Sequence, residues 1–114
     1  MDFRLNPNQI AFVDSVDRLA RDKLAATALA RAHSNAYPWD VAQLFADNGL
    51  LGITMPEAEG GQGGTLMDAV LAIQTVALHC PKSADVVQAG NFGPIRTFAQ
   101  YASPRLKEKY LTDL

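Results

Sequence analysis

The sequence has 114 residues, of which 48% are hydrophobic and 19% are charged. This composition is typical of one globular domain that buries a core without metal or disulfide support. The net charge of −2 argues against nucleic acid or an anionic membrane surface as the main binding partner.

The N-terminal residues show neither a basic segment before an apolar stretch nor an arginine- and serine-rich presequence. No apolar run approaches the roughly 20 residues that span a bilayer. Cys80 is the single cysteine and cannot form an internal disulfide, which favours a reducing compartment. We therefore expect a cytoplasmic protein without a membrane span, folded as one domain over residues 1–114.

The first predicted element is an amphipathic helix from about residue 7 to about residue 28. Asn6 can cap this helix, Pro7 suits its first turn, and Gln9 stands where a capping-box residue belongs. Its apolar residues recur at three- and four-residue steps: Ile10, Val13, Val16, Ala20 and Leu24.

A second, shorter helix is predicted to start at Pro38 and to stop at Asn48-Gly49. Residues 50–57, LLGITMPE, are too few and too interrupted by glycine to form a helix. They predict an extended connection with at most one short strand near residues 51–55.

A third helix is expected after Thr65, which can act as its cap with Asp68 near its N-terminus. Ser83 opens a fourth helical stretch, in which two glycines and Pro94 predict a kink rather than an end. A last helix follows the cap Ser103-Pro104. The sequence thus predicts an all-α fold, a bundle of about five helices joined by short connections.

The glycine-rich stretch MPEAEGGQGGT, residues 55–65, invites comparison with phosphate-binding loops. A Walker-type loop requires a lysine after its last glycine, but Thr65 follows Gly64. The dinucleotide-binding fingerprint requires a third glycine at the position that Leu66 occupies. Glu57 and Glu59 would repel a phosphate. The stretch is better interpreted as a tight turn in which glycine adopts positive φ angles.

Candidate chemical groups are sparse. His33 and His79 lie on different segments, so the sequence predicts no metal site. No residue of the chain is predicted to be catalytic, because the paired glutamates of the glycine loop lack shelter from water. Gln88 differs from its neighbours: it stands in an apolar stretch near Phe92, where a polar side chain needs a hydrogen-bond partner.

Three segments, read in order, resemble the N-terminal domain of the acyl-CoA dehydrogenases. Residues 5–24 are similar to the opening helix of that family. Residues 37–65 contain GLLGITMPE and GGQG, similar to the patterns Gly-Leu-x-Gly-Ile-x-x-Pro-Glu and Gly-Gly-x-Gly. Residues 91–114 include KEKYL, similar to Lys-x-x-Tyr-Leu. In the family the glycine loop joins two helices and helps to shape the acyl pocket.

The resemblance implies an enzyme that dehydrogenates the α and β carbons of an acyl-CoA thioester with FAD as hydride acceptor. It also implies a homotetramer that passes electrons to an electron-transfer flavoprotein. In the family, a middle β domain and a C-terminal helical domain carry the FAD contacts and usually the catalytic glutamate. Because residues 1–114 correspond to neither domain, we expect this chain alone to be inactive and to bind no FAD stoichiometrically.

The resemblance further implies that Ala84, Gln88 and Phe92 line the acyl pocket as substrate-binding residues. They recur every four residues and so project from one side of a helix. A kinked core helix without a ligand role is the alternative for this stretch. Two other functions for the chain stay open: a stand-alone helical interaction module without catalysis, and a small subunit that completes a heteromeric dehydrogenase.

Overall fold

The computed structural model describes residues 3–111, in which every regular element is helical and no strand occurs. The all-α prediction is confirmed. The α-helices are α1 (Pro7–Lys23), α2 (Ala28–Ala32), α3 (Trp39–Asp47), α4 (Leu66–Ala77), α5 (Pro81–Ala89), α6 (Pro94–Tyr101) and α7 (Pro104–Leu106). Shorter helical turns are Ala25–Thr27, Glu57–Glu59 and the π-helical turn Lys107–Leu111. In this part of the chain no helix combines the length and apolar character that crossing a membrane requires.

The predicted capping box at Asn6 forms, and the predicted cap at Thr65 forms a second capping box. Asn6 Oδ1 accepts a hydrogen bond from the Gln9 N–H at 2.8 Å, and Gln9 Oε1 accepts one from the Asn6 N–H at 2.9 Å. Thr65 and Asp68 make the same reciprocal pair at the start of α4. Each box satisfies N–H groups that have no partner within the helix, so the sequence sets where α1 and α4 begin.

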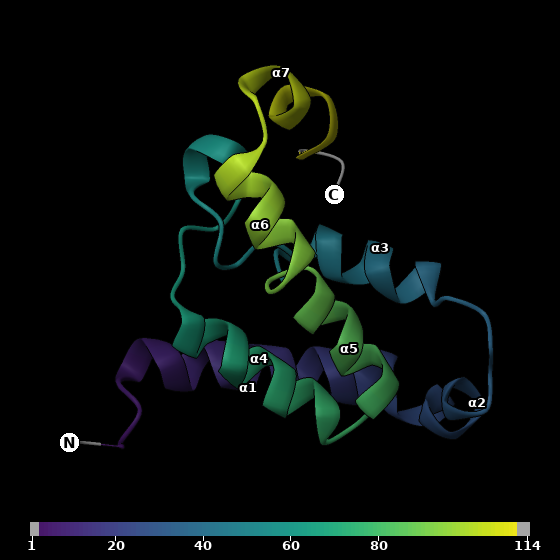
Figure 1. Cartoon of the computed structure of the whole chain (residues 1–114). Helices are drawn as coiled ribbons and strands as arrows, with labels where there is room; N and C mark the ends of the chain where they lie inside the picture. The colour runs from purple at the N-terminus through teal and green to yellow at the C-terminus, as the bar shows by residue number, and fades with distance from the viewer. Residues whose placement is uncertain (1–2, 112–114) are drawn as a thin grey trace.

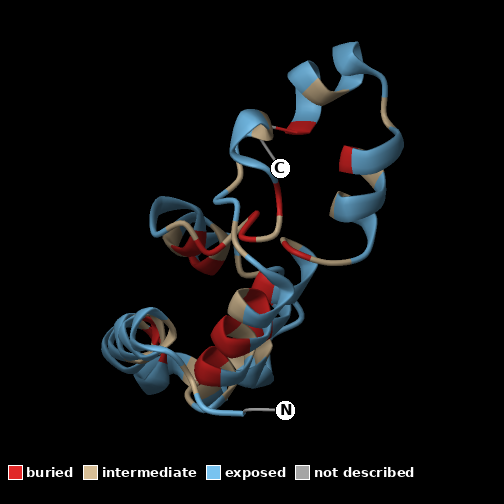
Figure 2. Cartoon of the chain, turned by 90° about the vertical axis from the view of Figure 1, so that its left-hand side faces the viewer, coloured by how far each residue is buried: buried red, intermediate tan, exposed pale blue. Residues whose placement is uncertain are grey.

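Helix α4 packs against both α1 and α5, and α5 also contacts α2 and α3 (Figure 1). The core lies between these helices, where Figure 2 shows buried residues concentrated. Its largest fully buried apolar side chains are Phe45, Leu24, Val41, Val76 and Val87. A smaller cluster of Met55, Ala99 and Leu111 joins α6 and the last turn to the glycine loop. The glycine loop therefore lies at the junction of two packed regions.

Three predicted features differ from the structure. The first predicted helix is broken after Lys23 and continues as a 3-10 turn and α2. The fourth stretch ends at Ala89 and restarts at Pro94, so a kink was the wrong expectation. Gly93, with φ 64°, turns the chain into α6, and Pro94 occupies the first helical position because it lacks an N–H. Residues 51–55 form bends and turns rather than the expected extended connection, and no strand occurs there, which the limit of at most one short strand allowed.

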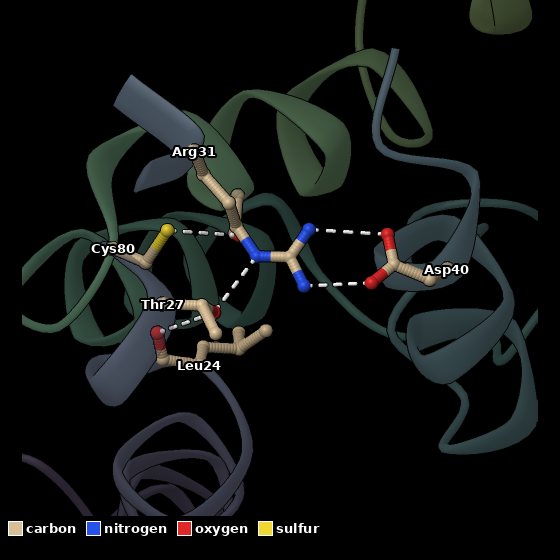
Figure 3. Close-up of polar contacts among 6 residues, drawn as sticks. Leu24, Thr27, Arg31, Asp40 and Cys80 are labelled. Atoms are coloured by element: carbon tan, nitrogen blue, oxygen red, sulfur yellow. Dashed lines mark hydrogen bonds and ion pairs between the residues drawn. The ribbon is translucent and has the colours of Figure 1, made fainter. Parts of the chain in front are cut away.

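The break between α1 and α2 is stabilised by Arg31 (Figure 3). The Arg31 Nε–H donates to Thr27 Oγ1 at 3.0 Å, and the Thr27 hydroxyl donates to the Leu24 carbonyl at 3.3 Å. The two terminal nitrogens of Arg31 donate to the two carboxylate oxygens of Asp40, at 3.1 and 2.6 Å. This bidentate pair ties α2 to the first turn of α3.

The hydrogen bonds from Arg31 lower the pKa of Asp40 from its ordinary value of 3.8. A carboxyl whose pKa is lower in the folded state stabilises the fold above its unfolded pKa and loses that contribution as the pH falls. We therefore expect Asp40→Asn to unfold more readily than the unmodified protein at neutral pH, with the difference shrinking below about pH 4. Urea unfolding of both proteins at several pH values measures this difference in the free energy of unfolding. Asp85→Asn, which removes an exposed carboxylate of α5 with no ion pair in the described residues, is the matched control; an equal effect there would contradict the prediction.

Candidate functional site

A groove of about 860 Å³ separates α3 from the glycine loop, α5 and α6. Most of its wall is apolar. Its lining comprises Tyr37, Trp39, Ala42, Gln43 and Ala46 from the α3 side, Leu51, Gly52, Met55 and residues 59–62 from the loops, Val86, Ala89 and Gly90 from α5, and Pro94, Ile95, Phe98 and Leu111 from the C-terminal side. Clefts of this size with apolar walls are suited to small ligands with hydrocarbon groups.

Two aromatic residues stand at the α3 side of the groove. The rings of Tyr37 and Trp39 meet edge to face, with 4.6 Å between their centroids. Trp39 is 76% exposed. As the single tryptophan of the chain, Trp39 is an intrinsic fluorescent reporter of this groove.

The opposite wall is fixed by Asn91, whose side chain is fully buried. The Asn91 amide nitrogen donates to the Leu50 carbonyl at 3.0 Å and to the Val87 carbonyl at 2.8 Å. Its side-chain oxygen accepts from the Thr54 N–H at 3.2 Å, and its main-chain carbonyl accepts from the Thr54 hydroxyl at 2.8 Å. Asn91 thus attaches residues 50–54 to the end of α5, and both segments line the groove.

The glycine loop folds back on the segment before it through its own amides. The N–H groups of Gly61, Gln62, Gly63 and Gly64 donate to the carbonyls of Pro56, Gly52, Met55 and Ile53, respectively. A phosphate-binding loop needs such N–H groups directed at the ligand. Here the protein itself accepts these hydrogen bonds, which agrees with the interpretation of the stretch as a turn.

The charge at the edge of the groove is paired. Glu59 is the charged residue of the lining, and its carboxylate lies 2.9 Å from the Lys107 ammonium. Both side chains are about three-quarters buried, so solvent screens the pair less than an exposed one. The pair connects the glycine loop with the last helical turn and leaves the wall of the groove nearly neutral.

The three residues predicted to contact substrate do not gather on this groove. Ala84 is buried in the main core, Gln88 is exposed, and Phe92 is half-buried in the turn after α5. The premise that Gln88 occupies a packed face was wrong: its side chain is exposed near the end of α5, although Ala84, one turn earlier on the same side, is buried. The buried amide of this segment is Asn91, three residues further on. Whether the three predicted residues contact substrate stays a prediction.

The two histidines remain apart from the groove lining. His79 Nε2 lies 2.7 Å from Asp17 Oδ1, a contact that connects the end of α4 to α1, and this hydrogen bond lowers the pKa of Asp17. Cys80 is buried with its sulfur 3.0 Å from Ser83 Oγ. Within residues 3–111, no three His, Cys, Asp or Glu side chains lie together in a way that could hold a metal ion.

Comparison with known proteins adds the family context. The family profile described as "Acyl-CoA dehydrogenase, N-terminal domain" matches residues 6–114. The 3-sulfinopropanoyl-CoA desulfinase of Variovorax paradoxus is 35% identical over 86 residues, covering 75% of this chain and 22% of that protein. The 3-sulfinopropanoyl-CoA desulfinase of Paraburkholderia xenovorans is 30% identical over 106 residues, covering 93% of this chain and 27% of that protein.

A third relative carries out a different reaction by its name. The acryloyl-CoA reductase (NADH) of Anaerotignum propionicum is 27% identical over 114 residues, covering all of this chain and 29% of that protein. The chain thus spans about a quarter of the length of these curated relatives. With the profile match over nearly every residue and an all-helical fold, the chain belongs to the acyl-CoA dehydrogenase family, as its N-terminal domain.

Proposed function

We propose that this domain supplies one wall of the acyl-binding site in a flavin-dependent acyl-CoA dehydrogenase. The observation that carries the proposal is the apolar groove between α3 and α5–α6, in a chain of a family whose named relatives act on acyl-CoA thioesters. An acyl chain in that groove would be held by apolar burial, at roughly 0.8 kcal/mol per buried methylene. The paired charge of Glu59 and Lys107 at the rim imposes little electrostatic penalty on such a chain.

The cofactor of the proposed reaction is FAD, which would supply the hydride acceptor. The glycine loop does not fit a flavin phosphate, because its amides already donate to protein carbonyls. Following the family resemblance, we assign FAD binding and the catalytic base to other domains of a longer protein, and assign no catalytic residue to this chain. A homotetramer and an electron-transfer flavoprotein as electron acceptor complete the proposal.

A second candidate reaction is removal of a sulfino group, since two of the relatives named above are desulfinases. A sulfinate is anionic and calls for a cationic partner. Among the described residues, the groove is lined by one acidic side chain and by no lysine or arginine. The observed wall therefore favours an uncharged acyl group. A helical module without catalysis remains the alternative from a different class.

Turnover of the full-length protein distinguishes these candidates. With butanoyl-CoA, we expect loss of the oxidised-flavin absorbance and formation of the enoyl-CoA. With 3-sulfinopropanoyl-CoA, a desulfinase would instead release sulfite without net flavin reduction. A protein that carries out neither reaction and binds neither thioester would support the interaction-module alternative and refute the proposal.

A further inference from the structure

The wall of the groove contains a contact in which the absence of a side chain matters. A Cβ atom placed on Gly90 would stand 2.7 Å from Leu51 Cδ2 and 3.4 Å from Leu51 Cβ, closer than packed carbon atoms approach. The backbone of Gly90 is right-handed helical, with φ −79°, so any residue could adopt it. A side chain at position 90 would therefore not strain the backbone. It would occupy space that the Leu51 side chain now fills.

The main chain on both sides of Leu51 is fixed to the end of α5. The Gly52 N–H donates to the Gly90 carbonyl at 2.9 Å, and the Leu50 carbonyl accepts from the Asn91 amide at 3.0 Å. If a side chain at position 90 contacted Leu51, the Leu51 backbone could move away only by breaking these hydrogen bonds. The available response is rotation of its side chain into another rotamer.

Rotation of Leu51 has a direct consequence for the groove. Leu51, Gly52 and Gly90 all line it, together with Ala89 of α5. Leu51 packs against the main core cluster as well as lining the groove, and the close-packed core leaves no room for a displaced side chain. A side chain at position 90 would thus displace the Leu51 side chain into the groove and narrow it.

We propose that Gly90 and Leu51 together set the width of the acyl site, with glycine at position 90 keeping Leu51 withdrawn so that bulky acyl groups fit. This inference rests on the proposed function, because it takes the acyl chain of an acyl-CoA as the occupant of the groove. It assigns a selectivity role to Leu51, which the sequence placed in a connection, and to Gly90, which the sequence placed at a helix kink. The substrate class it implies is acyl groups with a branch or a ring.

A double-mutant cycle in the full-length enzyme tests the pair, with butanoyl-CoA as the slim substrate and 3-phenylpropanoyl-CoA as the bulky one. Gly90→Ala is expected to lower kcat/KM for the bulky substrate roughly tenfold relative to the slim one, the size of effect that one methyl group has in an apolar pocket. In the Leu51→Ala background, Gly90→Ala should change this ratio less than about twofold, because the side chain that it displaces is gone.

Two further variants separate selectivity from folding. Leu78→Ala, which truncates an exposed leucine away from the groove lining, should leave the substrate ratio unchanged. Leu51→Val replaces Leu51→Ala if the latter lowers the unfolding midpoint too far for kinetics. Dissociation constants of the two thioesters, measured by calorimetry, provide a second readout that does not require turnover.

The outcomes are distinct. An unmodified enzyme that neither binds nor turns over either thioester overturns the proposed function and this inference with it. Normal activity with an unchanged substrate ratio in Gly90→Ala overturns the inference alone. An equal shift of the ratio by Gly90→Ala in both backgrounds also overturns it, because the effect would then not act through Leu51.

Discussion

Replacing Asn91 with leucine is expected to lower the free energy of unfolding by about 3 kcal/mol or more. The substitution leaves the Thr54 N–H and the carbonyls of Leu50 and Val87 without the partner that the Asn91 side chain provides. Each buried polar group left unpaired costs about 1–3 kcal/mol. Leucine branches at Cγ as asparagine does and can occupy much of the same space, but it has no donor or acceptor with which to satisfy these groups.

The matched control is Gln88→Leu, which makes the same change of an amide to an apolar side chain at an exposed position of α5. It should change the free energy of unfolding by less than about 0.5 kcal/mol, as exposed substitutions usually do. Urea unfolding followed by circular dichroism measures both variants. Equal effects of the two substitutions would show that the hydrogen bonds of Asn91 do not hold residues 50–54 in place.

Asn91 and Gln88 differ in burial, and the sequence analysis did not predict which of the two amides is buried. A helix that starts at Pro81 buries Ser83 and Val87, and the next position on that face is Asn91. The four-residue step from 83 to 87 to 91 was available in the sequence as a signal for the buried amide. The sequence analysis instead predicted a helix that begins at Ser83 and continues through the glycines. That prediction placed Gln88, rather than Asn91, on the buried face. The observed bounds of α5, Pro81–Ala89, place Ser83 and Val87 on the buried face that leads to Asn91.

Local chemistry explains what the sequence did predict. Both capping boxes depend on residues three apart, so no distant contact is needed to set the start of α1 or α4. The resemblance to a known family likewise came from motifs with fixed local spacing, GLLGITMPE and KEKYL. Features determined within one helical turn were therefore predictable.

The break after α1 required contacts that local patterns do not contain. Residues 24–30, LAATALA, favour an uninterrupted helix by composition. The structure ends α1 there nonetheless, with Leu24 buried in the core and Arg31 drawn to Asp40, nine residues later in the chain. Tertiary burial and an ion pair to another helix outweigh differences in helix propensity, which are below about 1 kcal/mol per residue.

Residue patterns did not predict the groove for a similar reason, although the family resemblance did place the glycine loop, which lines it, beside an acyl pocket. Its walls come from four separated segments, and its apolar residues are those that a sequence assigns to an ordinary core. Trp39 illustrates this, since a large apolar side chain is usually mostly buried and the structure leaves this one largely exposed beside the groove. Concave surfaces depend on how helices are arranged, which periodicity alone does not specify.

Gly61→Ala is expected to destabilise the protein by about 3 kcal/mol or more, although it adds a single methyl group. A Cβ on Gly61 would lie 2.3 Å from the Met55 carbonyl oxygen and 2.6 Å from its carbonyl carbon. These are main-chain atoms that cannot rotate away. Met55 is itself buried in the cluster with Ala99 and Leu111, so the loop would have to move away from the core and break hydrogen bonds such as that from the Gly63 N–H to Met55.

The neighbouring residue provides the control that separates crowding from backbone strain. Gly60 has a positive φ of 88° but open space around its Cβ position, so Gly60→Ala should cost about 1–2 kcal/mol from the left-handed conformation alone. If crowding dominates, urea unfolding will rank Gly61→Ala well below Gly60→Ala in stability. The reverse order would mean that the loop is not held against Met55. Since residues 59–62 line the groove, that result would also remove the fixed wall on which the proposed acyl site depends.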